Sequence, residues 1–287
     1  MTAEEAVPVA DRLRDIRGIV FDLDGTLVLG DRRNHGLVPL PGAVDLTAAL
    51  TARGLPWLTF TNGTTRTPEA YAETLRGIGF DLPDEAVLTP ATSAVDHFLA
   101  RGHRSALVLG GDGLKEPLRR AGIEIVAPVG KPAADAVLVG WYREFTMDEL
   151  EAACHAVFGG AVLYSSSQSV FFASAEGRAL GTSRAICAMI SSVTGATEQI
   201  VGKPSSIGVR CAAARLGADP RDLAVVGDDP ELEMAMARAA GALGIAVTTG
   251  IHPADRYAAL PPQQRPHLTV SGVDRLAALL PAATGTP

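Results

Sequence analysis

Two aspartates, Asp22 and Asp24, follow a short apolar run and are separated by one residue. The run, residues 19–21, is long enough only for a buried strand, and Gly25 allows the chain to turn directly after Asp24. Active sites of open parallel sheets form in the crevice beyond such strand ends. Two close carboxylates repel each other and favour a hard cation such as Mg²⁺, which would leave one oxygen of Asp22 free to attack a substrate. The same residues are also compatible with a plain strand-ending turn or a Ca²⁺ loop.

A second polar segment suits the binding of phosphate. Thr61, Asn62 and Gly63 follow the strand predicted at residues 56–60. A short hydroxyl and glycine-loosened backbone N–H groups can surround phosphoryl oxygens, so we expect Thr61 to donate to the phosphoryl group with Asn62 beside it. Read alone, these residues better fit an Asn-Gly turn with a capping threonine than a phosphate site.

Lys203 and Asp228 complete the set of candidate site residues. Lys203 follows a predicted strand and precedes the expected start of a helix. From this place its ammonium group can reach both a phosphoryl oxygen and the carboxylate of Asp22. Asp228 follows a strongly apolar run and would give the cation a third carboxylate beside Asp22 and Asp24, with Asp229 as the next candidate ligand.

Four segments resemble, in order, the four motifs of the haloacid dehalogenase superfamily of phosphohydrolases, at residues 21–27, 58–63, 201–204 and 224–229. Each motif lies at the end of a predicted strand, and four motifs in the expected order are far more specific than any one alone. The resemblance covers nearly the whole chain. It implies an α/β fold whose core is a Rossmann-like, doubly wound parallel sheet.

The resemblance also implies a reaction, the Mg²⁺-dependent hydrolysis of a phosphate monoester through an aspartyl-phosphate. Asp22 would be the nucleophile, and Thr61 and Lys203 would hold the phosphoryl group. Asp24 would protonate the leaving group and then accept a proton from water, while its backbone carbonyl would bind the metal ion. This assignment requires the pKa values of the two aspartates to be pushed apart.

The length of 287 residues is more than one ordinary core holds, and a second set of α/β segments lies between motifs two and three. We expect a core formed by residues 1–101 and 198–287 and an inserted α/β cap formed by residues 102–197. Superfamily members with such a cap include p-nitrophenyl phosphatases, pyridoxal phosphate phosphatases, and sugar or nucleotide phosphatases. Residues 110–113 are glycine-rich but lack the full dinucleotide-binding pattern, so we expect a turn there.

The composition limits the partners and the compartment. A net charge of −7 argues against a nucleic-acid-binding surface and favours a small phosphorylated metabolite that is drawn in locally. Cys154, Cys187 and Cys211 are far apart and are expected to be buried thiols of a protein in the reducing cytoplasm. The first 17 residues do not resemble a signal peptide, and no apolar run is long enough for a membrane span.

The chain departs from its relatives at two places. Glu233 occupies a position where the fourth motif commonly carries aspartate, which leaves open whether it supports the metal site in the same way. The cap turns also differ, and four aromatic residues near them either contact the substrate or form cap core or a cap-to-cap dimer contact, namely Trp141, Tyr142, Phe171 and Phe172. The natural substrate and the oligomeric state therefore stay open, and a homodimer through the cap is one expectation.

Two other functions are compatible with the same core. A phosphotransferase or mutase would pass the phosphoryl group to a sugar hydroxyl instead of water. A non-catalytic sensor of a phosphorylated ligand would keep the fold but is expected to lose the nucleophile, the lysine or a metal ligand, and this chain has all of them.

Overall fold

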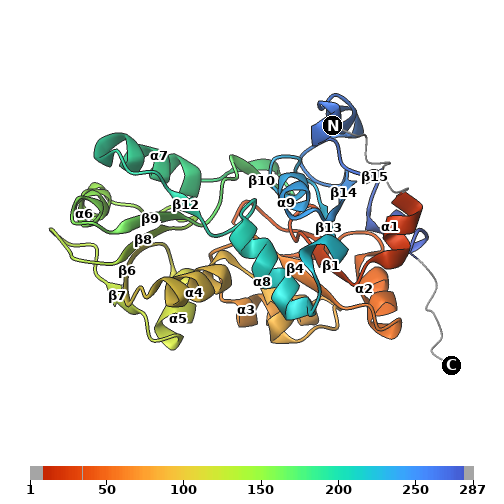
Figure 1. The fold of residues 1–287 in the computed structure, drawn as a ribbon, viewed down its shortest axis with the longest axis horizontal. Helices are drawn as coiled ribbons and strands as arrows, with labels where there is room; N and C mark the ends of the chain where they lie inside the picture. The colour runs from red at the N-terminus through yellow and green to blue at the C-terminus, as the bar shows by residue number, and fades with distance from the viewer. Residues whose placement is uncertain (1–8, 34, 281–287) are drawn as a thin grey trace.

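The computed structural model describes residues 9–33 and 35–280 and contains two parallel sheets that lie side by side along the long axis of the molecule (Figure 1). The larger sheet has six strands in the order β15 (Leu268–Val270), β14 (Leu243–Val247), β13 (Leu223–Gly227), β1 (Gly18–Phe21), β4 (Trp57–Phe60) and β5 (Val87–Leu88). The smaller sheet has five strands in the order β12 (Gln199–Ile200), β9 (Val162–Ser165), β8 (Ala136–Val139), β6 (Ser105–Leu109) and β7 (Glu124–Val126). The strands of the larger sheet come from parts of the sequence before and after the smaller sheet, so the smaller sheet is an insertion. The predicted α/β class is confirmed.

The two central strands of the larger sheet, β1 and β13, are buried at every residue. They pair in parallel, with Ile19 opposite Ala224. Strands that are covered on both faces must be apolar throughout instead of alternating, which explains the apolar runs in the sequence. The chain becomes polar immediately after each strand, so Asp22 and Asp228 lie at the same edge of the sheet.

Helices flank the larger sheet in two groups, as in a doubly wound fold. The helical segments of this part are α1 (Val9–Asp15), α2 (Ala43–Ala52), α3 (Pro68–Gly77), α8 (Ser206–Leu216), α9 (Glu233–Ala240), α10 (Ala254–Ala258), α11 (Val273–Ala277) and the 3-10 turns η1 (Asp84–Ala86), η2 (Pro220–Asp222) and η3 (Pro262–Gln264). Helix α8 contacts β4 and α9, and α9 contacts β13 and β14. Helix α2 contacts α11 and β4. Helices α8 and α9 begin directly after the third and fourth motifs, so they hold these motifs against the sheet.

Four helices accompany the smaller sheet, namely α4 (Pro90–Arg101), α5 (Asp112–Arg120), α6 (Met147–Phe158) and α7 (Ser183–Thr194). Helices α6 and α7 contact each other, and α4 contacts both α5 and α8, which joins the two halves of the molecule. The predicted capping box begins α6, where Thr146 Oγ1 accepts from Glu149 N at 3.2 Å and Glu149 Oε2 accepts from Thr146 N at 3.0 Å. Residues 110–113, expected as a turn, include the first two residues of α5.

Two short antiparallel hairpins join the halves on the side of the site. Strands β2 (Val28–Leu29) and β3 (Val38–Pro39) form the first hairpin, and β10 (Phe171–Ser174) and β11 (Gly177–Leu180) form the second. The tip of the β10–β11 hairpin reaches the loop after β2, where Ala175 N donates to Gly30 O at 2.7 Å. Arg32 N donates to Glu176 Oε2 at 3.1 Å in the same place. The inserted unit is therefore hydrogen-bonded to the core through this hairpin.

The proposed division at residues 1–101, 102–197 and 198–287 stays a prediction. Strand β12 pairs with β9, with Gln199 opposite Tyr164, so the five-stranded sheet continues beyond residue 197. The strand that precedes Lys203 thus belongs to the smaller sheet and not to the larger one. Residues 1–8, which carry part of the prediction about the N-terminus, lie outside the described residues.

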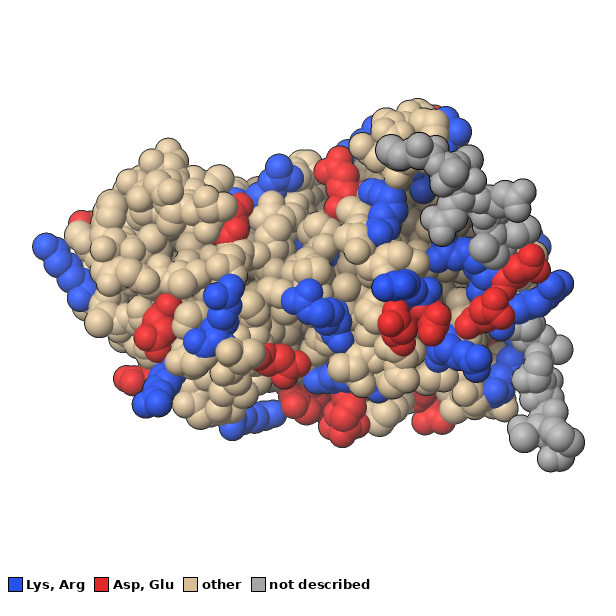
Figure 2. Space-filling view, viewed as in Figure 1, with Lys and Arg blue, Asp and Glu red and all other residues tan. Residues whose placement is uncertain are grey.

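The charged side chains are spread over the core surface seen in Figure 2, and the cysteines are buried as expected from the sequence. Figure 2 shows acidic and basic side chains interspersed over one face of the core, with few charged side chains over α6 and α7. All three cysteines are buried free thiols, and burial raises the pKa of Cys187 to about 12, which makes this thiol unreactive. Within residues 9–33 and 35–280, none of the helices has the length and apolar character needed to cross a membrane.

Candidate active site

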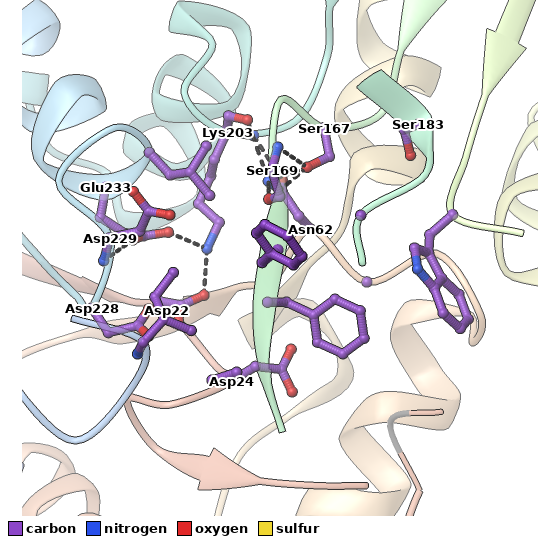
Figure 3. A pocket seen from close by; sticks show the side chains of 18 of the residues that line it. Asp22, Asp24, Asn62, Ser167, Ser169, Ser183, Lys203, Asp228, Asp229 and Glu233 are labelled. Carbon is purple, nitrogen blue, oxygen red and sulfur yellow. Dashed lines mark hydrogen bonds and ion pairs between the residues drawn. The ribbon is translucent and has the colours of Figure 1, made fainter. Parts of the chain in front are cut away.

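A buried lysine lies between two carboxylates at the edge of the larger sheet (Figure 3). Lys203 Nζ donates to Asp22 Oδ1, and it lies 2.6 Å from Glu233 Oε1. Burial alone lowers the pKa of Lys203, but the charges of Asp22 and Glu233 raise it above its ordinary value. The ammonium group is therefore charged and holds Asp22 in place, as the sequence predicted.

Asp24, two residues further, lies in a different environment. Its Oδ2 accepts a hydrogen bond from Thr61 Oγ1 at 3.4 Å. Burial and the charge of Asp22 raise the pKa of Asp24 to about 7, although Lys203 and Thr61 act in the opposite direction. Gly25 has a φ of 88°, in the left-handed region that glycine readily adopts, and it turns the chain away as expected. One aspartate is thus paired with an ammonium group, whereas its neighbour can carry a proton near neutral pH.

Asp228 is fixed by a loop that the sequence did not indicate. Its Oδ2 accepts from Ile251 N at 2.9 Å, and Tyr257 donates its hydroxyl hydrogen to the backbone carbonyl of Asp228 at 2.5 Å. A Cβ atom at Gly250 would lie 1.7 Å from Asp228 Oδ2, so only glycine fits there. Burial, followed by the charges of Asp22 and Glu233, raises the pKa of Asp228 well above its usual range. The residues at 249–257 show no motif, because their contacts with the site are entirely tertiary.

The segment after β4 organises the site with its side chains. Thr61 Oγ1 accepts from Gly63 N at 2.9 Å and donates to Asp24. The Asn62 amide faces away from the carboxylates, because its Oδ1 accepts from Lys203 N at 2.8 Å and its Nδ2 donates to Ser167 Oγ at 2.9 Å. Asn62 therefore holds the third motif and a loop of the inserted unit together, and the expected contact of residues 61–63 with phosphate stays a prediction.

The charge balance of the site favours a cation. Five carboxyl groups and one ammonium group line the same cavity, and the carboxyl groups belong to Asp22, Asp24, Asp228, Asp229 and Glu233. In the described ranges, no three Asp, Glu, His or Cys side chains converge as a ligand cluster. The predicted set, two carboxylates with a backbone carbonyl, does not need such a cluster, because Mg²⁺ keeps several of its water ligands. The residues present therefore fit a Mg²⁺ site.

The cavity extends from these carboxylates to the inserted unit. Its far side is formed by aromatic residues and hydroxyl groups, namely Trp141, Phe171, Phe172, Thr64, Thr65, Ser167, Ser169 and Ser183. Of the four aromatic residues left open by the sequence, three thus face the site. Tyr142 does not line it and meets Phe145 edge to face, with ring centroids 5.3 Å apart. The three serines were not predicted as site residues, although Ser167 and Ser169 lie in the serine-rich segment 165–169, which belongs to a cap turn that differs from the relatives.

Comparison with known proteins agrees with this geometry. A model of the haloacid dehalogenase-like hydrolases matches residues 19–124, and a second model of HAD-like hydrolases matches residues 200–276. An acid sugar phosphatase from Staphylococcus aureus is 30% identical over 240 residues, which cover 83% of this chain and 89% of the relative. The chain belongs to the haloacid dehalogenase-like hydrolases.

Solved structures of two similar proteins share the fold over almost their full length. A 4-nitrophenylphosphatase from Thermotoga maritima is similar with a TM-score of 0.82 and 25% identity, covering 93% of this chain and 98% of that protein. NagD from the E. coli K-12 strain is similar with a TM-score of 0.77 and 26% identity, covering 90% and 97% of the two chains. The match over almost the full length confirms that the inserted α/β unit is a cap of the type found in this group.

Glu233 takes an unexpected place in this member of the family. Its Oε2 accepts from Asp229 N at 3.1 Å, and its other oxygen binds Lys203. A Cβ atom at Gly227 would lie 2.2 Å from Glu233 Cγ, so the glycine makes room for the longer side chain. Glu233 is therefore a partner of the lysine and of the backbone of the fourth motif, and its support of a metal ion stays open.

Proposed function

We propose that this hydrolase is a Mg²⁺-dependent phosphatase that cleaves a small-molecule phosphate monoester through an aspartyl-phosphate. The observation that carries the proposal is the pair of unlike aspartates in one cavity, with Asp22 bound to Lys203 and Asp24 having a pKa of about 7. A nucleophile must be ionised and an acid must carry a proton, so these two roles need carboxyl groups in different environments. The names of the relatives, an acid sugar phosphatase and a 4-nitrophenylphosphatase, support the same class of reaction.

Three groups at the ends of β1 and β13 would hold the metal ion. They are the carboxylates of Asp22 and Asp228 and the backbone carbonyl of Asp24. When bound there, the ion would offset the carboxylate charges and withdraw electron density from the phosphoryl oxygens. The buried, hydrogen-bonded carboxylate of Asp228 is already oriented by the backbone of Ile251.

In the first step, a carboxylate oxygen of Asp22 attacks phosphorus while the bond from phosphorus to the leaving oxygen breaks. Asp24 gives its proton to that leaving oxygen and becomes a carboxylate. Lys203 and Thr61 donate hydrogen bonds to the phosphoryl oxygens, whose charge is spread in the transition state. The product of this step is an alcohol or phenol and a phosphorylated Asp22.

In the second step, the Asp24 carboxylate takes a proton from water as the water oxygen attacks the same phosphorus. The bond between phosphorus and Asp22 breaks, which releases inorganic phosphate and restores both aspartates to their starting protonation states. A pKa near neutrality suits Asp24 for both directions of proton transfer. A phosphotransferase would differ only in having a sugar hydroxyl in place of this water.

We also propose a small phosphorylated metabolite as substrate, the cytoplasm as compartment, and a homodimer through the cap as assembly. The cavity between the core and the inserted unit, and the interspersed charges of Figure 2, support a small ligand over a nucleic acid. The three buried thiols support a reducing compartment. Gel filtration with light scattering measures the assembly directly.

Phosphate release from p-nitrophenyl phosphate and a panel of sugar, nucleotide and cofactor monophosphates tests the proposal. We expect release that requires both Mg²⁺ and Asp22, and none from Asp22→Asn. Product analysis with an added sugar acceptor separates hydrolysis from transfer. A folded protein that binds Mg²⁺ and releases phosphate from no ester contradicts the proposal and favours the sensor.

A further inference from the structure

The cap side of the cavity holds three aromatic side chains in fixed positions. The backbone N of Trp141 donates to Thr64 Oγ1 at 2.9 Å, and the indole Nε1 donates to Leu180 O at 2.8 Å. The Trp141 ring meets Phe172 edge to face, with centroids 5.8 Å apart. Phe171 lines the same cavity from the neighbouring position on β10. The indole orientation is therefore set from the core at one end and from β11 at the other.

The β10–β11 hairpin, which carries both phenylalanines, is hydrogen-bonded to the core. Its tip is bonded to the loop after β2 through Ala175 and Glu176. On β11, Arg178 Nη2 donates to Ile251 O at 3.2 Å, and Ile251 also lines the cavity. These contacts anchor the β10–β11 hairpin at two separate core loops. The aromatic side chains and the carboxylates line the same cavity, so a leaving group bound there would contact this hairpin.

The cavity offers no free cation to a charged leaving group. Among the described residues that line it, Lys203 is the sole cationic side chain, and it is already paired with Asp22 and Glu233. Arg66 influences Asp24 electrostatically, but its guanidinium lies over the Tyr71 ring, 5.4 Å from the centroid, and does not line the cavity. A second anionic group would thus lose hydration without meeting an unpaired cationic side chain in the lining of the cavity.

The hydroxyl groups of the cavity are also engaged with the protein. Ser167 Oγ donates to Ser169 Oγ at 2.8 Å and accepts from Asn62, and Ser183 Oγ lies 3.0 Å from Ser166 Oγ. Thr64 Oγ1 bonds both backbone groups of Trp141. Because these hydroxyl groups already bond one another and the backbone, a sugar would gain fewer hydrogen bonds from them than from hydroxyl groups without partners.

From these contacts we infer that Trp141, Phe171 and Phe172 select a phosphate monoester whose leaving group is uncharged and aromatic. The ring would lie against the phenylalanines and the indole, while the phosphoryl group reaches Asp22. Aromatic pairs gain dispersion and quadrupole interactions beyond the burial of area. The inference rests on the proposed phosphatase activity and adds the chemical class of its substrate.

Substrates with matched leaving groups test the inference without a difference in chemical reactivity. Benzyl phosphate and a glucose phosphate esterified at its primary hydroxyl both release a primary alcohol. We expect kcat/KM for benzyl phosphate to exceed that for the sugar ester by about tenfold or more. Benzyl phosphate with a para carboxylate is expected to lose about tenfold relative to benzyl phosphate, because no lining cation is free.

Variants of the aromatic residues locate the selectivity. Phe171→Ala and Phe172→Leu are expected to lower the benzyl-to-sugar ratio of kcat/KM by about tenfold and threefold, respectively. Phe171 is 38% exposed, so its removal leaves the fold intact and keeps the test valid if the second variant unfolds. Tyr142→Ala is the matched control, since this neighbour of Trp141 lies outside the cavity.

The outcomes separate the inference from the proposed function. Hydrolysis that depends on Asp22 but favours the sugar ester overturns the inference and leaves the phosphatase standing. An unchanged ratio in Phe171→Ala, or an equal change in Tyr142→Ala, also overturns it. Absence of Asp22-dependent hydrolysis of both esters is instead a failure of the proposed function.

Discussion

The two sides of the cavity are built in different ways. On the core side, Asp22, Lys203 and Glu233 are 6%, 2% and 1% exposed and bind one another, next to buried parallel strands. On the cap side, Phe171 is 38% exposed and sits on a two-stranded hairpin. Charged groups need burial and mutual pairing to acquire reactive properties, whereas a surface that selects a leaving group needs only shape and polarity. The reaction and the choice of substrate can therefore change independently.

The largest expected effect comes from Asp22→Asn, on the reactive side. Loss of the attacking carboxylate is expected to lower kcat by about ten-thousandfold or more for every ester, because the covalent route is removed. Steady-state kinetics with benzyl and sugar phosphates measure this. Asp45→Asn on the exposed surface of α2 is the matched control. Residual activity that differs between the two esters would show that the two sides of the cavity are coupled.

Lys203→Met is the next largest change. Methionine has a similar length but no charge, so the phosphoryl oxygens lose a donor and Asp22 and Glu233 lose their shared counter-charge. We expect kcat to fall by about a hundredfold to a thousandfold, as for removal of one oxyanion donor. A drop in Tm of the metal-free protein is expected as well, since two buried carboxylates are left unpaired. A variant with full activity contradicts the role of Lys203.

Asp24→Asn distinguishes an acid from a merely structural residue. We expect a loss of about a hundredfold or more for benzyl phosphate, whose alcohol needs a proton on leaving. For the first step with p-nitrophenyl phosphate the expected loss is smaller, because nitrophenolate leaves without one. Single-turnover measurement of alcohol or phenol release resolves this step. Equal losses for both esters would exclude Asp24 as the acid.

Most of the core side could be predicted from the sequence, because its signals are local. Each of the strands β1 and β13 is an apolar run with an aspartate directly after it. The same short segment therefore predicts both a buried strand and a site residue at its end. The sequence shows that Glu233 follows the fourth motif. Its ion pair with Lys203 is a tertiary contact between different motifs, which no local pattern predicts. The sequence also placed the strand before Lys203 in the core, although it hydrogen-bonds to β9 of the smaller sheet.

The cap side could not be predicted to the same extent. The contact of Asn62 with Ser167 joins residues from different sheets, and no spacing in the sequence encodes it. Strands β10 and β11 have no regular alternation of buried and exposed residues, so their hairpin gives little signal. Whether Trp141 or Tyr142 faces the site depends on one turn of the backbone, which only the structure reveals.

Glu233→Asp shortens the side chain that binds Lys203. The shorter carboxylate cannot reach both the ammonium group and Asp229 N from the same backbone position, so we expect kcat/KM to fall by about tenfold, as for residues that orient a catalytic group. The benzyl-to-sugar ratio should stay constant. Glu231→Asp is the control, because the Glu231 side chain is 69% exposed. A change in the ratio would contradict the independence of the two sides.

Glu176→Ala is expected to have the smallest effect. It removes the carboxylate that accepts from Arg32 N at the exposed tip of the hairpin. We expect KM for benzyl phosphate to rise by about twofold to threefold, because an exposed polar contact contributes little. We expect kcat for the sugar ester to change by about threefold at most. Glu144→Ala, on another exposed cap loop, serves as the control. A loss as large as that of Glu233→Asp would contradict a minor role for this contact.

The bond from Ala175 N to Gly30 O has a consequence for how such enzymes diversify. It joins two main-chain atoms, so it does not depend on which side chains the hairpin carries. Residues 171–180 can therefore be exchanged for those of another family member while the segment remains seated on the core. Substrate preference can therefore change through substitutions in residues 171–180, in evolution or by engineering, without disturbing the fold of the core.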